Sequence, residues 1–144
     1  MTDQTIHATS IAINGRAILL LGPSGAGKTD LALRLIDRGA MLISDDYTTL
    51  TRKNGKLIAN PPETIAGKIE IRHIGIVDLP YVTDVTVALA IRLEEKPERM
   101  PDLPAAMNVN GVSIPLVALA ALECSTPIKA EYALKLFGLA TDPA

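Results

Sequence analysis

Apolar and polar positions alternate in short blocks along the first third of the chain, and this pattern predicts strands around one helix. Two apolar runs, 6–13 and 16–21, are separated by Asn14-Gly15, a dipeptide that favours a two-residue β-hairpin turn. Residues 30–38 instead place apolar side chains four positions apart, which predicts an amphipathic helix, and 41–43 is a further apolar run. This order of elements predicts the beginning of an α/β sheet, in which ligands gather at the carboxyl ends of the strands.

Beyond residue 46 the pattern is mostly that of β-strands. The predicted strands are 47–51 and 56–59 around Lys53-Asn54-Gly55, then 69–71, 74–77, 85–93, and a pair around Asn110-Gly111. The charged segment 94–104 carries three prolines and is expected to be an exposed loop. Thr126 is expected to cap a helix that begins at Pro127, reaches Phe137 and ends at Gly138. The pattern predicts one α/β domain, residues 1–144, with a mixed, strand-rich sheet.

The turn between the second predicted strand and the helix has the sequence of a phosphate-binding loop. Residues 22–29 match the pattern G-x-x-x-x-G-K-[ST], which works only at such a strand-to-helix turn. Backbone amides around the glycines cradle phosphate oxygens, and the helix N-terminus adds a favourable dipole. The lysine would neutralise the β- and γ-phosphates, and the threonine hydroxyl would ligate Mg²⁺. The positions expected to contact the nucleotide are Gly22, Pro23, Ser24, Gly25, Ala26, Gly27, Lys28 and Thr29.

The composition excludes several other classes of function. The 14 basic and 16 acidic residues nearly balance, so no overall field attracts nucleic acid or an anionic membrane. One Phe, three Tyr and no Trp provide no platform for stacking bases. A single cysteine permits neither an internal disulfide nor a cysteine-built metal site. With short apolar runs and no signal-peptide pattern, the sequence predicts a soluble, cytoplasmic protein that binds neither membrane nor nucleic acid.

Two adjacent carboxylates, Asp45 and Asp46, follow the strand after the helix. Phosphoryl transfer needs a metal ligand beyond Thr29 and a group that activates the nucleophile. We expect one carboxylate to reach Mg²⁺ or its water and the other to act as the base; the pattern leaves open which does which. Asp78 ends another apolar strand and is a rival, since an aspartate there has the general form of a Walker B segment.

Two further groups could belong to such a site. Glu70 and Arg72 are two positions apart in one predicted strand, so their side chains share one face and both could serve Mg²⁺ and phosphate. The alternative is a solvated strand whose charges form surface salt bridges. His7 and His73 are the only histidines, and their spacing gives no metal signature.

In combination these residues resemble the catalytic domain of HPr kinase/phosphorylase, the bacterial serine kinase that acts on the phosphocarrier protein HPr. The compact length, without an N-terminal regulatory domain, resembles the short alphaproteobacterial branch. The matching segments are Ile6-His7, 22–29, the helix from Ala32-Leu33 to Arg38-Gly39, Asp45-Asp46, 69–72 and 75–77. The resemblance implies a P-loop fold like that of HPr kinase and PEP carboxykinase, ATP and Mg²⁺ as cofactors, HPr as partner, and a hexamer.

The resemblance also implies a role for each matching position. The implied catalytic residues are His7, Lys28 and the pair Asp45-Asp46, one of which accepts the proton in phosphorylation and donates it in the reverse reaction. The metal ligands are Thr29 and Glu70, with Asp45 as a further candidate, and Arg72 helps to position phosphate. The resemblance therefore favours the aspartate pair over Asp78.

The chain differs from the family pattern at two places. His73 stands where family members usually have glycine, and Ile114-Pro115 is followed by Leu-Val-Ala-Leu where longer enzymes carry an active-site arginine in Gly-Arg-Asn. The phosphorylase reaction relies on binding a second phosphate, so that activity is left open, as is the coupling between subunits. Apolar residues at 134–139 could form a subunit contact.

Two other functions use the same core. A regulatory module would bind ATP and signal without phosphorylating anything, and a small-molecule kinase would transfer phosphate to a metabolite. The sequence has no long lid insertion with paired arginines and no Asn-Lys-x-Asp motif, which argues against a small-molecule kinase and a GTPase respectively. Phosphate transfer to HPr distinguishes the serine kinase from both alternatives.

Overall fold

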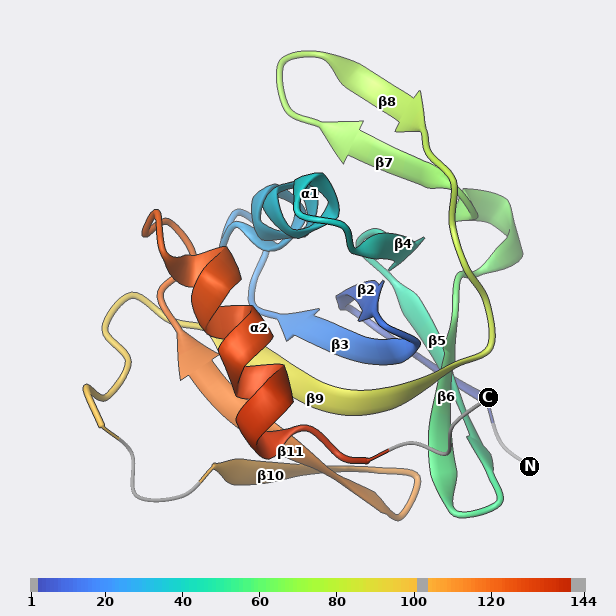
Figure 1. Cartoon of the computed structure of the whole chain (residues 1–144). Coiled ribbons are helices and arrows are strands. Elements are labelled where there is room, and N and C mark those ends of the chain that lie inside the picture. Colours follow the sequence, from blue (N-terminus) through green and yellow to red (C-terminus); the bar gives the residue numbers. More distant parts are fainter. Residues whose placement is uncertain (1–2, 101–103, 141–144) are drawn as a thin grey trace.

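The computed structural model describes residues 3–100 and 104–140 (Figure 1). The strands are β1 (Asp3–Ile6), β2 (Thr9–Ile13), β3 (Arg16–Leu21), β4 (Met41–Ser44), β5 (Thr48–Lys53), β6 (Lys56–Asn60), β7 (Lys68–Ile71), β8 (Gly75–Asp78), β9 (Val85–Leu93), β10 (Ala105–Val109) and β11 (Val112–Leu119). The helices are α1 (Lys28–Asp37) and α2 (Thr126–Phe137), with a 3₁₀ turn at Glu63–Ile65. In this part of the chain nine strands form one mixed sheet, as the α/β prediction requires, while β7 and β8 form a separate hairpin.

Strand β9 is the centre of the main sheet. One edge of β9 lies parallel to β3, and its other edge pairs first with β6 and then, from Ala90 onward, with β11. Strand β2 is antiparallel to both β3 and β4, so the two strands that α1 connects run parallel with β2 between them. The carboxyl ends of β3 and β4 therefore lie at the same edge of the sheet, which is where such sheets bind ligands.

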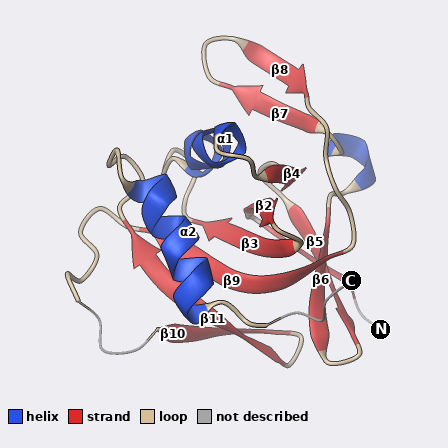
Figure 2. Ribbon diagram, viewed as in Figure 1, coloured by secondary structure: helices blue, strands red, loops and turns tan. Residues whose placement is uncertain are grey.

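The central strands are buried on both faces because successive side chains point to opposite sides of a sheet. Ile18 and Leu20 of β3 pack with Leu31 of α1 in one apolar cluster, which α2 also joins. Figure 2 shows the two helices beside β3 and β9. Leu19, between them in sequence, belongs to a second cluster with Leu50 of β5 and residues from β6, β10 and β11. The continuous apolar run in β3 thus reflects burial between the helices and the curled outer strands.

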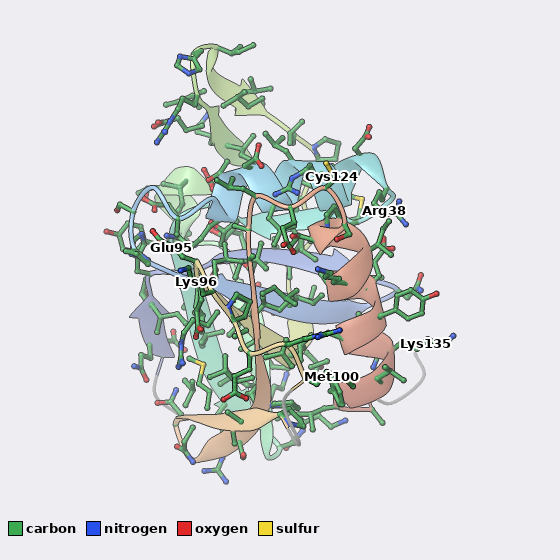
Figure 3. The ribbon with its side chains drawn as sticks, turned by 90° about the vertical axis from the view of Figure 1, so that its left-hand side faces the viewer. Arg38, Glu95, Lys96, Met100, Cys124 and Lys135 are labelled. Atoms are coloured by element: carbon green, nitrogen blue, oxygen red, sulfur yellow. The ribbon has the colours of Figure 1, made fainter. Side chains whose placement is uncertain are left out.

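The two helices are also joined to each other. Arg38, which caps the end of α1 and is labelled in Figure 3, donates from Nε and Nη2 to the carboxylate of Glu131 on α2, at 2.9 and 2.7 Å. These hydrogen bonds and the charge of Glu131 raise the pKa of the Arg38 guanidinium above its usual value. The helices have 10 and 12 residues, and neither described helix has the length and apolar character needed to cross a membrane.

Each of the three Asn-Gly pairs turns the chain between two strands, as the sequence predicts. Both residues of every pair have positive φ: 50° and 78° at Asn14-Gly15, 53° and 75° at Asn54-Gly55, and 51° and 80° at Asn110-Gly111. Two consecutive positive φ values define the hairpin turn whose twist matches that of the flanking strands. The Asn-Gly signal was therefore sufficient to locate these hairpins.

Two local predictions are wrong. The predicted strand 6–13 is interrupted at His7 and Ala8, because β1 pairs with β5 whereas β2 pairs with β3 and β4. Thr126 is the first residue of α2 rather than its cap; Ser125 takes the cap position, and the Thr126 hydroxyl donates to the Ala120 carbonyl. Of the expected loop 94–104, residues 101–103 lie outside the described residues.

Strands β7 and β8 form a hairpin that projects beyond α1 (Figure 1). Buried Ile69 anchors its base, and the Leu79 amide donates to the Gly67 carbonyl at 2.8 Å. Ile74 and Ile76, toward the tip, are exposed. The hairpin therefore contacts the body of the protein through β7, next to the helix that carries the phosphate-binding sequence.

Candidate active site

The predicted phosphate-binding loop connects the end of β3 to the first residue of α1. Gly25 and Gly27 have φ of 83° and 101°, values that side-chain-bearing residues rarely adopt, and Gly27 occupies the cap position of the helix. A Cβ on Gly27 would also come within 3.1 Å of the Ala121 Cβ. The first amides of the helix have no intrahelical partner, so this turn presents donors to an anion.

Lys28 lies inside the loop rather than in solvent. Its ammonium donates to the carbonyl oxygens of Gly22 and Pro23 at 2.6 and 3.1 Å, and the residue is only 6% exposed. An ammonium has three donors, so one remains for a ligand. The lysine thus holds the loop in shape and places a positive charge beside the loop amides.

Asp45 is a buried carboxylate that three separate elements hold in place. Its Oδ1 accepts from the Thr29 hydroxyl at 2.7 Å and from the Thr9 hydroxyl at 3.3 Å, and its Oδ2 accepts from the Glu70 amide at 3.1 Å. These donors come from α1, β2 and β7, and the aspartate is 7% exposed. The carboxylate is therefore fixed directly against the hydroxyl of the phosphate-binding loop.

Asp46 points elsewhere. Its backbone has φ of +70°, a left-handed conformation that costs an L-residue about 1 kcal/mol and that Asp tolerates better than most. Its Oδ1 lies 2.8 Å from Nε2 of His7, and its side chain is 59% exposed. The His7 ring also lies 5.2 Å from the ring of Tyr47. The aspartate pair is thus divided into one buried carboxylate and one exposed carboxylate paired with an imidazole.

The structure separates the other predicted residues. Glu70 lies on β7 with its backbone bonded to Asp45 and its side chain in solvent. Arg72 is exposed and lies past the end of the strand, because the chain turns at Ile71, where its carbonyl accepts from the Ile74 amide and His73 has φ of +74°. The expectation that Glu70 and Arg72 alternate along one strand face is therefore wrong.

The rival aspartate, Asp78, lies on the outer strand of the hairpin. Its carboxylate accepts from the ammonium of Lys68 at 2.9 Å, across the β7–β8 pair, and it is exposed. That geometry makes Asp78 part of a surface ion pair, and Asp45 is the carboxylate next to the loop.

A depression of about 680 Å³ lies beside the phosphate-binding loop. Three segments line it: residues 23–26 of the loop, 93–95 at the end of β9, and 120–123 before α2. Arg34 of α1 holds the last segment, since its guanidinium donates to the carbonyls of Ala121 and, at 3.0 Å, Glu123. These hydrogen bonds join α1 to carbonyls that lie 87 and 89 residues away in the sequence.

The oxygen atoms at the loop suit a nucleotide-bound Mg²⁺. Mg²⁺ commonly takes one or two carboxylates together with phosphate oxygens and water, and the Thr29 hydroxyl and Asp45 carboxylate supply two hard donors side by side. Within residues 3–100 and 104–140, no cluster of three His, Cys, Asp or Glu side chains could hold a metal unaided. The residues therefore fit a cation that arrives with phosphate, rather than a free-standing metal site.

Comparison with known proteins identifies a family for this fold. Residues 1–122 match the family model described as HPr Serine kinase C-terminal domain. The HPr kinase/phosphorylase of Clostridium tetani is 37% identical over 90 residues, which are 62% of this chain and 30% of that protein. The one from Caldicellulosiruptor bescii is 32% identical over 128 residues, 80% of this chain and 41% of the relative. This chain thus spans less than half the length of each.

A solved structure matches nearly the whole chain. The Hpr(Ser) kinase/phosphatase from Coxiella burnetii superposes with a TM-score of 0.80 and 33% identity, over 92% of this chain and 94% of that one. The loop, the buried aspartate and the strand order around them thus occur in a fold that a related enzyme shares. This chain belongs to the HPr serine kinase C-terminal domain family.

Proposed function

We propose that this chain is a cytoplasmic, ATP- and Mg²⁺-dependent serine kinase domain that phosphorylates the phosphocarrier protein HPr. One observation carries the proposal. The buried carboxylate of Asp45 accepts a hydrogen bond from the loop hydroxyl of Thr29, while the next residue, Asp46, is exposed to solvent and pairs with His7. We infer that Asp45 would serve the metal and that Asp46 would serve the proton. The names of the related enzymes support HPr as the acceptor.

The nucleotide would bind along the loop. Amides of residues 22–29 and the Lys28 ammonium would hold the phosphates, and the nucleoside would occupy the depression formed by residues 93–95 and 120–123. When bound, Mg²⁺ supplies charge neutralisation at the β- and γ-phosphates. Thr29 and Asp45 would hold it, and Glu70, whose backbone amide donates to Asp45, would add a further carboxylate.

Asp46 would act as the base. Among the described residues Asp45 already accepts three hydrogen bonds, whereas the exposed Asp46 accepts one side-chain hydrogen bond, from His7, at a single oxygen. With His7 Nε2–H donating to Oδ1, Oδ2 is available to take the proton of an incoming serine hydroxyl. The serine oxygen then bonds to the γ-phosphorus as the bond to the β-phosphate oxygen breaks, and ADP leaves. Arg72, exposed in the β7–β8 turn, would help to position phosphate.

The test is transfer of labelled γ-phosphate from ATP to HPr of the same organism, followed by identification of phosphoserine. Wild type should transfer phosphate, and Asp46→Asn should lose about 10²–10⁴-fold in kcat, the usual contribution of a general base. Absence of transfer by folded wild type that binds ATP would favour the regulatory module instead. Phosphoserine-HPr incubated with inorganic phosphate tests the reverse reaction in the same assay.

We also propose self-association, as the hexamers of the family imply. Ile128, Tyr132 and Leu136 are exposed and recur every fourth residue of α2, so they form one apolar stripe. Leu134, in the segment expected to make the contact, is buried against the sheet and does not belong to it. Light scattering should give a mass above 15.3 kDa for wild type and a reduced mass for Tyr132→Lys. A monomer at every concentration would contradict this.

A further inference from the structure

We propose that Thr9 is a positioning residue that keeps the two aspartates in their separate roles; the proposal rests on the kinase function above. Thr9 opens β2 and is fully buried. Its hydroxyl donates to Oδ1 of Asp45 at 3.3 Å and accepts from the backbone amide of Asp46 at 3.1 Å. One oxygen atom therefore contacts both members of the aspartate pair.

The position of Thr9 explains why the pair needs such a contact. Strand β4 ends at Ser44, which pairs with Ser10, and the register shifts between this pair and the preceding Leu42–Ile11 pair. Asp46 lies beyond the last pair, so the ladder offers its amide no partner, and the Thr9 hydroxyl provides one. This bond is made across 37 residues of sequence and holds the residue that has φ of +70°.

The two hydrogen bonds of the Thr9 hydroxyl direct the two aspartate side chains to different places. The bond to Asp45 holds that carboxylate toward the loop hydroxyl of Thr29, and the bond to the Asp46 amide holds a backbone conformation that turns the second side chain toward His7. Without the hydroxyl, Asp46 is free to relax to an ordinary negative φ, which would direct its carboxylate away from the imidazole. The Thr9 hydroxyl bonds to the two aspartates, whereas Lys28 bonds to the carbonyls of Gly22 and Pro23 within the nucleotide loop.

A purely structural role would have a different signature. If Thr9 served only as a buried β-branched side chain, valine would replace it without loss, because the two have nearly the same shape. The neighbouring Thr48 provides a matched control: it is also fully buried, and its hydroxyl bonds to Ser10 and to the Ala8 carbonyl, not to an aspartate. Thr48→Val thus removes a buried hydroxyl from the same region without touching the pair.

The experiment compares Thr9→Val, Thr9→Ser and Thr48→Val in two assays. In phosphate transfer to HPr, Thr9→Val should lower kcat about 10- to 100-fold, the usual effect of misplacing a reacting group, with the KM for Mg·ATP changed less than about threefold. Thr9→Ser should recover most of kcat, and Thr48→Val should stay near wild type. Wild-type kcat in folded Thr9→Val would overturn the proposal.

Amide hydrogen exchange at Asp46, followed by NMR, is the second assay and needs no activity. Exchange should quicken about 5- to 10-fold in Thr9→Val and remain slow in Thr9→Ser and Thr48→Val. Unchanged exchange would overturn the proposal, even if wild type proved unable to phosphorylate HPr; the transfer assay on wild type separates that second failure from this one. If Thr9→Val does not fold, Thr9→Ala removes the same hydroxyl with a smaller side chain.

Discussion

Nε2 of His7 lies 2.8 Å from Oδ1 of Asp46, although 39 residues separate them in sequence. The contact exists because the chain leaves β1 at Ile6 and enters β2 at Thr9, which places His7 at the junction, beside the turn that follows β4. The imidazole can orient the carboxylate and hold a proton next to it, so it should matter for phosphate transfer and not for nucleotide binding.

Replacing His7 should therefore separate catalysis from binding. We expect His7→Ala to lower kcat about 10- to 100-fold while the Kd for Mg·ATP, measured by calorimetry, changes little. The control is His73→Ala, which removes the other histidine from the exposed hairpin turn and should leave kcat within about twofold. Equal losses in the two variants would remove His7 from the proposed machinery.

The buried aspartate and its rival can be distinguished directly. Asp45→Asn should raise the Mg²⁺ concentration needed for half-maximal activity and lower kcat about 10²-fold or more, because it removes a charged oxygen beside Thr29. Asp78→Asn should retain activity, since Asp78 pairs with Lys68 at the surface of the hairpin. Measuring transfer across a magnesium titration checks both; a loss confined to the Asp78 variant would reverse the assignment.

Lys28 should be required for nucleotide binding. Lys28→Met keeps the apolar stem but removes the ammonium that bonds to the Gly22 and Pro23 carbonyls and would contact phosphate. We expect the Kd for Mg·ATP to rise at least about tenfold, as hydrogen bonds to charged groups usually imply. Lys53→Met, in the exposed β5–β6 hairpin, is the control and should bind normally; tight binding by the Lys28 variant would contradict the proposed nucleotide site.

Gly27 should tolerate no side chain. Gly27→Ala forces alanine to φ near +101° and brings its Cβ to 3.1 Å from that of Ala121, so both strain and crowding result. Gly39→Ala meets the same kind of φ, +112°, with open space around it. Thermal unfolding should show a loss of about 1–2 kcal/mol at Gly39 and more at Gly27. Equal losses would mean that the methyl group added at position 27 fits beside Ala121 without a cost in stability.

Arg34 should stabilise the depression indirectly, by holding one of the segments that line it. Arg34→Leu removes the donors that hold the carbonyls of Ala121 and Glu123, so segment 120–123 should loosen. We expect a loss of about 1–3 kcal/mol in stability and a severalfold rise in the Kd for Mg·ATP. Hydrogen exchange across residues 120–125 checks the local effect. Protection that stays at the wild-type level would show that the segment is held by other contacts.

Several features were predictable because short-range physics determines them. The loop 22–29 and the three Asn-Gly hairpins depend on glycine and asparagine at positions that need positive φ, which a sequence displays directly. The helix periodicity and the long apolar strand 85–93 were equally plain. Errors arose where pairing with a distant strand decides the local structure. At His7 the chain passes from a strand paired with β5 to a strand paired with β3, and Arg72 lies in a turn because β7 ends at Ile71, one residue before the end that the predicted strand face required.

The sequence by itself determined that this chain builds a phosphate-binding loop between a strand and a helix and follows it with paired carboxylates, because those features depend on neighbours a few residues apart. Only the tertiary structure decided that Asp45 turns inward to Thr29 while Asp46 turns outward to His7. It also brought Thr9 to both aspartates. The physical reason is register: hydrogen bonds across 16 to 39 residues form only once β2 and β4 are aligned side by side.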